Sequence, residues 1–341
     1  MIHIKNDKGF SAIKSIILIT ILGVLIITGS YVYGKNHKST ITKSSNLLVN
    51  SSLKPPTIPT TGSYLGAYVD PGTPSGQKGT TSEITALPAF NKSIGAQLNL
   101  VTLYASWHAT APITEISTIS TSGGVPMISW GCNDTDMNVA AGKDDPYITS
   151  YAQTLKSYGK PVFLRWFWEM NFLASQSGSD TQGRANKCIN SGGSAGYVSA
   201  WQHIWSIFHS VGATNVAFVW CPGLGGKGSL TSFYPGDKYV DWIAIDGYDR
   251  QHQGNTAFST VFSPFYKEFT SHNKPIMIGE TGATTDQVAF LQGMQTSLPN
   301  NFPNIKAVDY FDAVGPAGNW TLQGAGLTQF SQMVQSSYFK P

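Results

Sequence analysis

Short apolar segments alternate with amphipathic segments over most of this 341-residue chain, and that alternation constrains the fold more than any other feature. Seven segments have a helical pattern: Glu83–Ile94, Ile113–Ser120, Pro146–Tyr158, Tyr197–Val211, Phe258–Ser271, Val288–Thr296 and Leu327–Ser336. Eight segments rich in β-branched and aromatic residues predict strands: Tyr64–Val69, Leu98–Trp107, Val125–Cys132, Pro161–Phe167, Asn215–Trp220, Trp242–Asp246, Pro275–Gly279 and Ile305–Phe311. Only the fifth strand lacks a clear helix after it.

The strands are hydrophobic along almost their whole length, which is typical of parallel strands buried on both faces. Eight strands, seven of which are followed by a helical segment, favour closure into a (β/α)8 TIM barrel over an open sheet. An open nucleotide-binding sheet would need a glycine-rich turn after its first strand. Residues 70–76 carry prolines where the phosphate-facing amides of such a turn would lie.

The N-terminal part of the chain has a different character from the rest. Ser15–Tyr33 is uncharged and is almost long enough to cross a bilayer, so residues 1–35 are predicted to be a signal anchor. A prepilin-like leader around Lys8-Gly9-Phe10 is the alternative. Residues 36–61 are rich in Ser, Thr and Pro and predict a flexible linker before a catalytic domain at 62–341. The domain is expected outside the cell, anchored to the membrane, or secreted if the segment is cleaved.

The distribution of charge argues against a nucleic-acid partner. Residues 1–60 hold seven Lys and one Asp, a net charge of +6. The remaining fifteen Lys and Arg and eighteen Asp and Glu give the folded part −3. The formal charge of +3 therefore comes from the N-terminal segment, and no basic face is expected on the domain.

Three cysteines are too few for a disulfide scaffold, but they allow one bridge in an extracellular protein. Cys188 and Cys221 are the first candidates, because both are expected on the same rim of the barrel. Cys132 pairing with Cys188 is the alternative, since sequence alone does not give connectivity. The chain has no CxxC or HExxH motif, so no metal site is predicted.

Two glutamates stand at the ends of predicted strands and carry the functional prediction. Glu169 follows the fourth strand and Glu280 ends the seventh. In a barrel of eight parallel strands these ends face each other across the mouth where active sites lie. Two opposed carboxylates predict a retaining glycosidase, in which one is the acid/base and the other the nucleophile. The simpler alternative for either is an ion pair with a neighbour such as Arg165.

Aromatic residues near the same strand ends predict a carbohydrate cleft, because indole rings stack on the apolar faces of sugars. Tyr248 is expected to hydrogen-bond a carboxylate across the mouth. The predicted substrate-binding residues are Trp107, His108, Trp130, Arg165, Trp168, Trp220 and Tyr248.

The motif Arg165-Trp-Phe-Trp-Glu169-Met-Asn171, together with Gly279-Glu280-Thr-Gly282, resembles glycoside hydrolase family 26, whose best-known members are endo-β-1,4-mannanases. The resemblance covers the chain from about Gly62. It implies a (β/α)8 barrel, a retaining mechanism with Glu169 as acid/base and Glu280 as nucleophile, a β-mannan or related polysaccharide as substrate, and no cofactor.

The chain departs from this family directly before the acid/base, where Trp168 stands in place of the usual histidine. A tryptophan can donate one N–H and stack, so the binding of the sugar is expected to differ. A β-1,3/1,4-glucanase, a β-1,3-xylanase and a catalytically inactive carbohydrate-binding barrel remain alternatives.

Overall fold

A computed structural model describes residues 53–70, 80–132, 135–172, 188, 192–226, 229–249, 257–315 and 318–340. The predicted signal anchor and residues 36–52 of the predicted linker lie outside these ranges, so both stay predictions. Among the described residues, no helix combines the length and the apolar content that a bilayer crossing requires. Residues from Leu53 onward form one compact unit. Its first residues contact the barrel, since the Thr214 hydroxyl donates to the Leu53 carbonyl over 3.1 Å.

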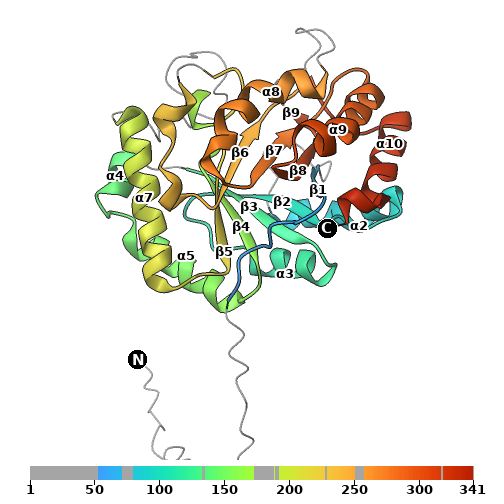
Figure 1. Ribbon diagram of the computed structural model, residues 1–341. Helices are drawn as coiled ribbons and strands as arrows, with labels where there is room; N and C mark the ends of the chain where they lie inside the picture. Colours follow the sequence, from blue (N-terminus) through green and yellow to red (C-terminus); the bar gives the residue numbers. More distant parts are fainter. Residues whose placement is uncertain are drawn as a thin grey trace, which may run out of the picture. The chain divides into compact units, whose positions relative to one another are not determined.

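Eight parallel strands close into a barrel in sequence order, as Figure 1 shows. The strands β1 and β8 complete the ring through six residue pairs, from Tyr64↔Ala307 to Val69↔Asp312. The barrel strands are β1 Tyr64–Val69, β2 Leu100–Ala105, β3 Val125–Trp130, β4 Val162–Trp166, β5 Val216–Trp220, β6 Trp242–Asp246, β7 Ile276–Thr281 and β8 Ile305–Asp312. The predicted (β/α)8 barrel is therefore confirmed.

Helices surround the barrel on its outer side (Figure 1). They are α2 Thr80–Ile94, α3 Ile113–Thr121, α4 Asp136–Ala140, α5 Asp145–Tyr158, α7 Gly193–Val211, α8 Phe258–Phe269, α9 Gln287–Asn301 and α10 Gly324–Gln335. The 3-10 helices are η1 Met170–Phe172, η2 Leu230–Phe233, η3 Asp237–Tyr239, η5 Thr270–His272 and η6 Ser337–Phe339. The weak link between β5 and β6 holds only η2 and η3 among its described residues, because Pro235 and Gly236 interrupt any longer helix. The short strands β9 Val314–Gly315 and β10 Gly318–Asn319 pair beyond β8.

The core has two layers, because alternate residues of each strand point to opposite faces. The layer inside the barrel includes Phe163, Val219, Trp242 and Met277. The layer between strands and helices is larger and contains most of the tryptophans. Trp130 stacks on Tyr151 of α5 with ring centroids 4.3 Å apart. Burying such side chains stabilises the fold by about 1.5–3 kcal/mol each.

The disulfide joins Cys132 to Cys188, with Cα atoms 6.0 Å apart, and Cys221 is a buried free thiol. The prediction of a Cys188–Cys221 bridge is therefore wrong, and the alternative pairing is correct. The reason is the alternation along β5. It directs the side chain of Cys221 into the barrel interior, whereas Cys132 and Cys188 both lie in the outer layer.

Candidate active site

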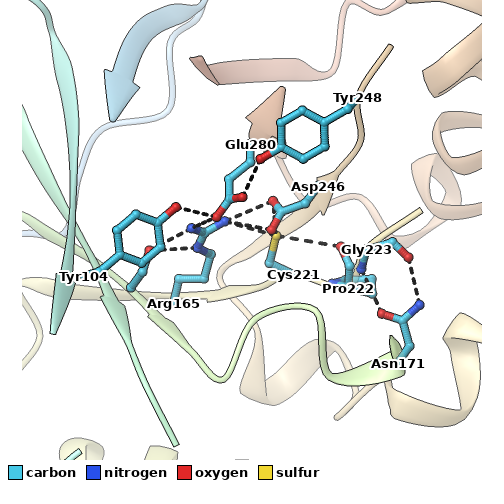
Figure 2. A network of polar contacts seen from close by, with 10 residues as sticks. Tyr104, Arg165, Asn171, Cys221, Pro222, Gly223, Asp246, Tyr248 and Glu280 are labelled. Carbon is cyan, nitrogen blue, oxygen red and sulfur yellow. Dashed lines mark hydrogen bonds and ion pairs between the residues drawn. The ribbon is translucent and has the colours of Figure 1, made fainter. Parts of the chain in front are cut away.

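The centre of the site is Arg165 of β4, whose side chain is completely buried at the mouth of the barrel (Figure 2). Its guanidinium donates to the Asp246 carboxylate over 2.9 and 3.1 Å and to Glu280 Oε1 over 2.6 Å. It also donates to the Ser129 hydroxyl over 2.7 Å. Side chains from four strands, β3, β4, β6 and β7, therefore meet around one cation.

Glu280 accepts hydrogen bonds from three side chains. Besides Arg165, the Tyr104 hydroxyl donates to Glu280 Oε1 over 2.6 Å, and the Tyr248 hydroxyl donates to Oε2 over 2.6 Å. The expected contact of Tyr248 with a carboxylate is confirmed. The ion pair with Arg165, which the sequence analysis gave as the simpler alternative for a strand-end glutamate, is also present. Arg165 is fully buried, so it supports Glu280 and offers no surface to a substrate, contrary to the prediction that it binds one.

Asp246 and Cys221 lie on the other side of the guanidinium. The Cys221 thiol donates to Asp246 Oδ1 over 3.0 Å, and both side chains are fully buried. Gly279 makes this packing possible, because a Cβ there would lie 2.6 Å from Asp246 Oδ1 and 2.7 Å from the Cys221 sulfur. A glycine directly before Glu280 is therefore a requirement of the network.

Burial and charge set the protonation of the network. Burial alone would lower the pKa of Arg165, but Asp246 and Glu280 hold it well above its ordinary value, so the guanidinium stays charged. Burial raises the pKa of Asp246, and the guanidinium of Arg165 opposes that rise. Burial, reinforced by the Glu280 charge, raises the pKa of Tyr104 and Tyr248 well above the ordinary value. Both phenols therefore remain protonated donors.

Glu169 reaches the mouth because the chain leaves β4 in an unusual conformation. Phe167 and Glu169 have positive φ angles, 45° and 56°, in the left-handed region that non-glycine residues rarely occupy. The Glu169 amide donates to the Cys221 carbonyl over 2.8 Å, which holds the turn. Carboxylate oxygens of Glu169, Asp246 and Glu280 lie within 4.8 Å of one another. The two predicted glutamates are therefore brought together.

Asn171 ties the turn after β4 to the loop after β5 (Figure 2). Its amide nitrogen donates to the Gly223 carbonyl over 2.8 Å, and its amide oxygen accepts from the Gly223 N–H over 2.8 Å. A Cβ on Gly223 would lie 2.0 Å from the ring of Phe172, so only glycine allows this approach. These two hydrogen bonds hold the turn that carries Glu169 against the loop after β5.

Trp168 lies against the network, with its ring half-buried. The guanidinium carbon of Arg165 is 5.3 Å from its ring centroid, within cation–π range. The ring of Tyr104 is 5.1 Å away. The indole is thus a wall beside Arg165 and Tyr104.

Two predicted sugar platforms are in the core. Trp130 and Trp220 are completely buried, and their N–H groups donate to the Tyr147 hydroxyl and the Phe233 carbonyl. These indoles have no surface to offer to a substrate, so the prediction that they bind one is wrong. They point away from the barrel interior because of their place in the strand alternation.

Trp107 and His108 lie beyond the end of β2. Trp107 is 5% exposed and packs on Trp130 with ring centroids 4.5 Å apart, so it too is mainly a core residue. His108 has a side chain that is 54% exposed, and its Nε2 lies 3.0 Å from Asp144 Oδ1. Its φ of 65° turns it out of the strand direction. Of these two, only His108 could contact a substrate.

Sequence reasoning missed Ser129, Tyr104 and Asp246, and it assigned Cys221 to a disulfide rather than to this network. A usable signal existed, because all four are polar and stand at inward positions near the carboxyl ends of strands. Trp320, which packs over Tyr248 with ring centroids 4.5 Å apart, gave no such signal. It lies outside the barrel strands, after β10.

Within the described part of the chain, the acidic side chains close enough to share a cation are Glu169, Asp246 and Glu280. Two of them already form ion pairs with the Arg165 guanidinium. A metal ion would have to compete with this buried organic cation, so the donor set suits the arginine better than a metal.

Similarity searches give a consistent picture of the chain's relatives, although no family model matches it. Over 224 residues, the chain is 32% identical to Endoglucanase H of Acetivibrio thermocellus. This match covers 59% of this chain and 23% of that protein. Over 175 residues, the chain is 27% identical to a β-1,3-xylanase of a Vibrio species. This second match covers 48% of this chain and 33% of that protein. The chain thus spans about a quarter to a third of the length of these curated relatives.

The barrel superposes on the catalytic domain of a GH26 endo-β-1,4-mannanase from Bacillus sp. JAMB-750 with a TM-score of 0.58 and 14% identity. The match covers 81% of this chain and 86% of that one, and it shows the fold alone. In sequence the chain is thus similar to glycoside hydrolases, and in fold it is similar to family 26 mannanases, which agrees with the resemblance of its motifs.

Proposed function

We propose that this protein is a retaining glycoside hydrolase that cleaves a β-linked polysaccharide. The observation that carries the proposal is the distance between its two strand-end glutamates, whose carboxylate oxygens lie within 4.8 Å. Retaining enzymes hold their carboxyl groups about 5–5.5 Å apart, whereas inverting enzymes need about 6.5–9.5 Å for an intervening water. The three donors that hold Glu280 in place support catalysis over a barrel that only binds sugar.

In the proposed mechanism, Glu280 is the nucleophile and Glu169 the acid/base. Glu280 attacks the anomeric carbon while the Glu169 carboxyl gives its proton to the leaving oxygen. Water then attacks the glycosyl ester, its proton passes to Glu169, and the Glu280 carboxylate leaves. The donors from Arg165, Tyr104 and Tyr248 disperse the negative charge of Glu280 before attack and after release.

For the substrate we propose a β-glucan ahead of a β-mannan. Of the two relatives described, the one with the higher identity is named an endoglucanase. In addition, Trp168 presents a ring where the resembled family places a hydrogen-bonding histidine. Mannose differs from glucose in the axial orientation of its C2 hydroxyl, and an indole, with one N–H donor and no acceptor, is a poorer hydrogen-bonding partner for that hydroxyl than a histidine. The similarity to the solved mannanase structure concerns the fold, and a fold hosts several specificities.

The direct test is incubation of the full chain with β-1,3/1,4-glucan, β-1,3-xylan and β-1,4-mannan. We expect reducing ends to appear fastest from the glucan, with the β-configuration retained in the first product seen by NMR. An α-configured first product would contradict the two-glutamate retaining scheme. Binding to these polysaccharides without any release of reducing ends would support an inactive carbohydrate-binding barrel.

Substitution of each glutamate tests its role. Glu169→Gln and Glu280→Gln should each lower turnover at least about a thousandfold, because each removes a group that takes part in both steps. Glu268→Gln, at an exposed position on α8, is the matched control and should retain wild-type activity.

Azide separates the two roles with an aryl β-glycoside as substrate. Glu169→Ala should give a β-glycosyl azide, because azide replaces water in the second step. Glu280→Ala should give an α-glycosyl azide by direct displacement. If Glu169→Ala gave the α-azide and Glu280→Ala the β-azide, Glu169 would be the nucleophile and Glu280 the acid/base.

The place of action remains a proposal of its own. We propose that residues 1–35 anchor the enzyme outside the cell, because a polysaccharide is too large to enter and Ser15–Tyr33 has the character of a membrane span. Fractionation of cells that produce the full chain should recover activity with the membrane. Activity confined to the cytosol would contradict the proposal.

A further inference from the structure

The two oxygens of Glu280 have different surroundings (Figure 2). Oε1 accepts two hydrogen bonds of 2.6 Å, one from Arg165 and one from the Tyr104 hydroxyl. Oε2 accepts one hydrogen bond of 2.6 Å, from the Tyr248 hydroxyl. A carboxylate oxygen has about two lone-pair sites, so Oε1 is saturated and Oε2 keeps one site open.

From this difference, and resting on the retaining mechanism proposed above, we propose that the oxygen facing Tyr248 is the atom that attacks the sugar, and that Tyr104 is a positioning residue that stabilises the Glu280 carboxylate as it leaves. Attack by Oε1 would require one of two short, charge-assisted hydrogen bonds to break first. Attack by Oε2 requires no such loss.

Tyr104 is held firmly for this role. Its backbone amide donates to Glu83 Oε2 over 2.9 Å, which anchors the end of β2 to α2. Its ring packs against the rings of Tyr68 and Trp168, with centroid distances of 4.8 and 5.1 Å. The hydroxyl therefore has little freedom to turn away from Glu280.

The electron count of the two steps shows where Tyr104 acts. In the first step an Oε2 lone pair forms the bond to the anomeric carbon, the glycosidic bond breaks, and its oxygen takes the proton of Glu169. Oε1 becomes the carbonyl oxygen of a neutral ester and its hydrogen bonds weaken. In the second step water bonds to the anomeric carbon, its proton goes to Glu169, and the electrons of the Oε2–carbon bond return to the carboxylate. Charge then reappears on Oε1 beside Tyr104 and Arg165.

A donor on Oε1 therefore favours the second step over the first, because it stabilises charged carboxylate more than neutral ester. Removing it with Tyr104→Phe should slow release of the sugar by about 10- to 100-fold, the effect of one hydrogen bond to a charged group. The first step should change less than about threefold, because the nucleophile becomes slightly more reactive as it loses a donor. Since kcat/KM reports the first step, kcat and KM should fall together while kcat/KM stays nearly constant.

The experiment uses the full chain and 2,4-dinitrophenyl β-glycosides of cellobiose, xylobiose and mannobiose, taking the one that the wild type hydrolyses fastest. We expect Tyr104→Phe to show a burst of one dinitrophenolate per active site, followed by slow turnover. Mass spectrometry during the slow phase should find the protein heavier by the mass of one covalently bound disaccharide. Tyr151→Phe is the matched control, because it removes another buried hydroxyl, on α5, behind the barrel wall. It should show wild-type kinetics.

Equal losses in kcat and kcat/KM for Tyr104→Phe would overturn the inference, and so would unchanged kinetics. A crystal structure of the fluoro-sugar-trapped enzyme gives an independent reading. The ester bond is expected on the oxygen facing Tyr248, with Arg165 and Tyr104 on the carbonyl oxygen, and the opposite arrangement would overturn the assignment. If the wild type hydrolyses none of the three glycosides and no polysaccharide, the proposed function itself fails, which is a distinct result.

Discussion

Trp168 shows at the scale of one residue how the site depends on contacts distant in sequence. It replaces a histidine of the resembled family, and its ring packs against Arg165 and Tyr104, which both donate to Glu280. The indole thus shields one side of the buried ion pair from water. Charge-assisted hydrogen bonds are stronger in such a shielded environment than in water. This contact explains an aromatic residue here without requiring that it bind a sugar.

Truncation of Trp168 tests that reading. Trp168→Ala should lower kcat/KM by about tenfold, because water gains access to the guanidinium and the cation–π contact, about 0.5–2 kcal/mol, is lost. Trp168→Phe keeps a ring at the same place and should stay within about threefold of wild type. Steady-state kinetics on the preferred polysaccharide measure both. A rise in KM alone for Trp168→Ala would instead identify the indole as a sugar platform.

At the scale of elements, β8 and the segment after it hold one wall of the mouth. Asp312, the last residue of β8, accepts from the Leu322 amide over 2.6 Å. The segment between them carries Trp320, which packs on Tyr248. Burial raises the pKa of Asp312 to about 6, and the nearby Asp70 adds to the rise, while the bond from Leu322 opposes it. A raised pKa means that the folded state favours the protonated form.

This shift predicts a pH dependence of stability. Between the unfolded pKa of about 3.9 and the folded pKa of about 6, the folded protein binds more protons than the unfolded chain, so the free energy of unfolding falls as pH rises. Asp312→Asn keeps the acceptor for Leu322 and removes the titration. Its stability relative to wild type should rise by about 2–3 kcal/mol between pH 4 and pH 7.

Urea denaturation at several pH values measures the effect. Asp286→Asn, at an exposed position before α9, is the control and should follow the wild-type pH curve. A constant difference between Asp312→Asn and wild type across this range would contradict the expected linkage.

Most elements could be predicted from sequence because hydrophobic periodicity reflects burial. The segments Tyr64–Val69 and Trp242–Asp246 were predicted with the observed bounds. Helix α4, Asp136–Ala140, was missed because five residues are too short for a periodic signal. Strand β7 extends to Thr281, past the predicted end at Gly279, because irregular pairing with β6 and β8 keeps Glu280 in the strand.

At the scale of the whole molecule, ring closure requires β1 to lie close to its neighbours. Only one residue pair, Ala67↔Val101, is in ladder register between β1 and β2, against six between β1 and β8. Gly66 lies at the tight contact with β2. A Cβ at this position would be 2.2 Å from the Leu100 carbonyl oxygen, a backbone atom that cannot move alone.

Gly66→Ala should therefore destabilise the barrel by about 1–3 kcal/mol or more, the usual cost of overpacking. Gly293→Ala is the matched control, because its nearest neighbour is an ordinary contact with Phe258 at 3.8 Å. Gly293 lies within α9, so its alanine should be neutral or stabilising by up to about 1 kcal/mol. Thermal unfolding should show a lower midpoint for the first variant only. Equal midpoints would mean that β1 can shift without cost.

The sequence by itself determined the eight-stranded barrel and the two glutamates, because strand periodicity and strand-end position are local properties of the chain. Tertiary structure decided which aromatic residues are core. Trp130 and Trp220 resemble Trp168 in sequence position, but the strand alternation buries the first two against helices. It also decided the pairing of Cys132 with Cys188 and the meeting of Tyr104, Arg165, Asp246 and Glu280. These contacts join residues 56 to 176 positions apart, and only closure of the ring determines such distances.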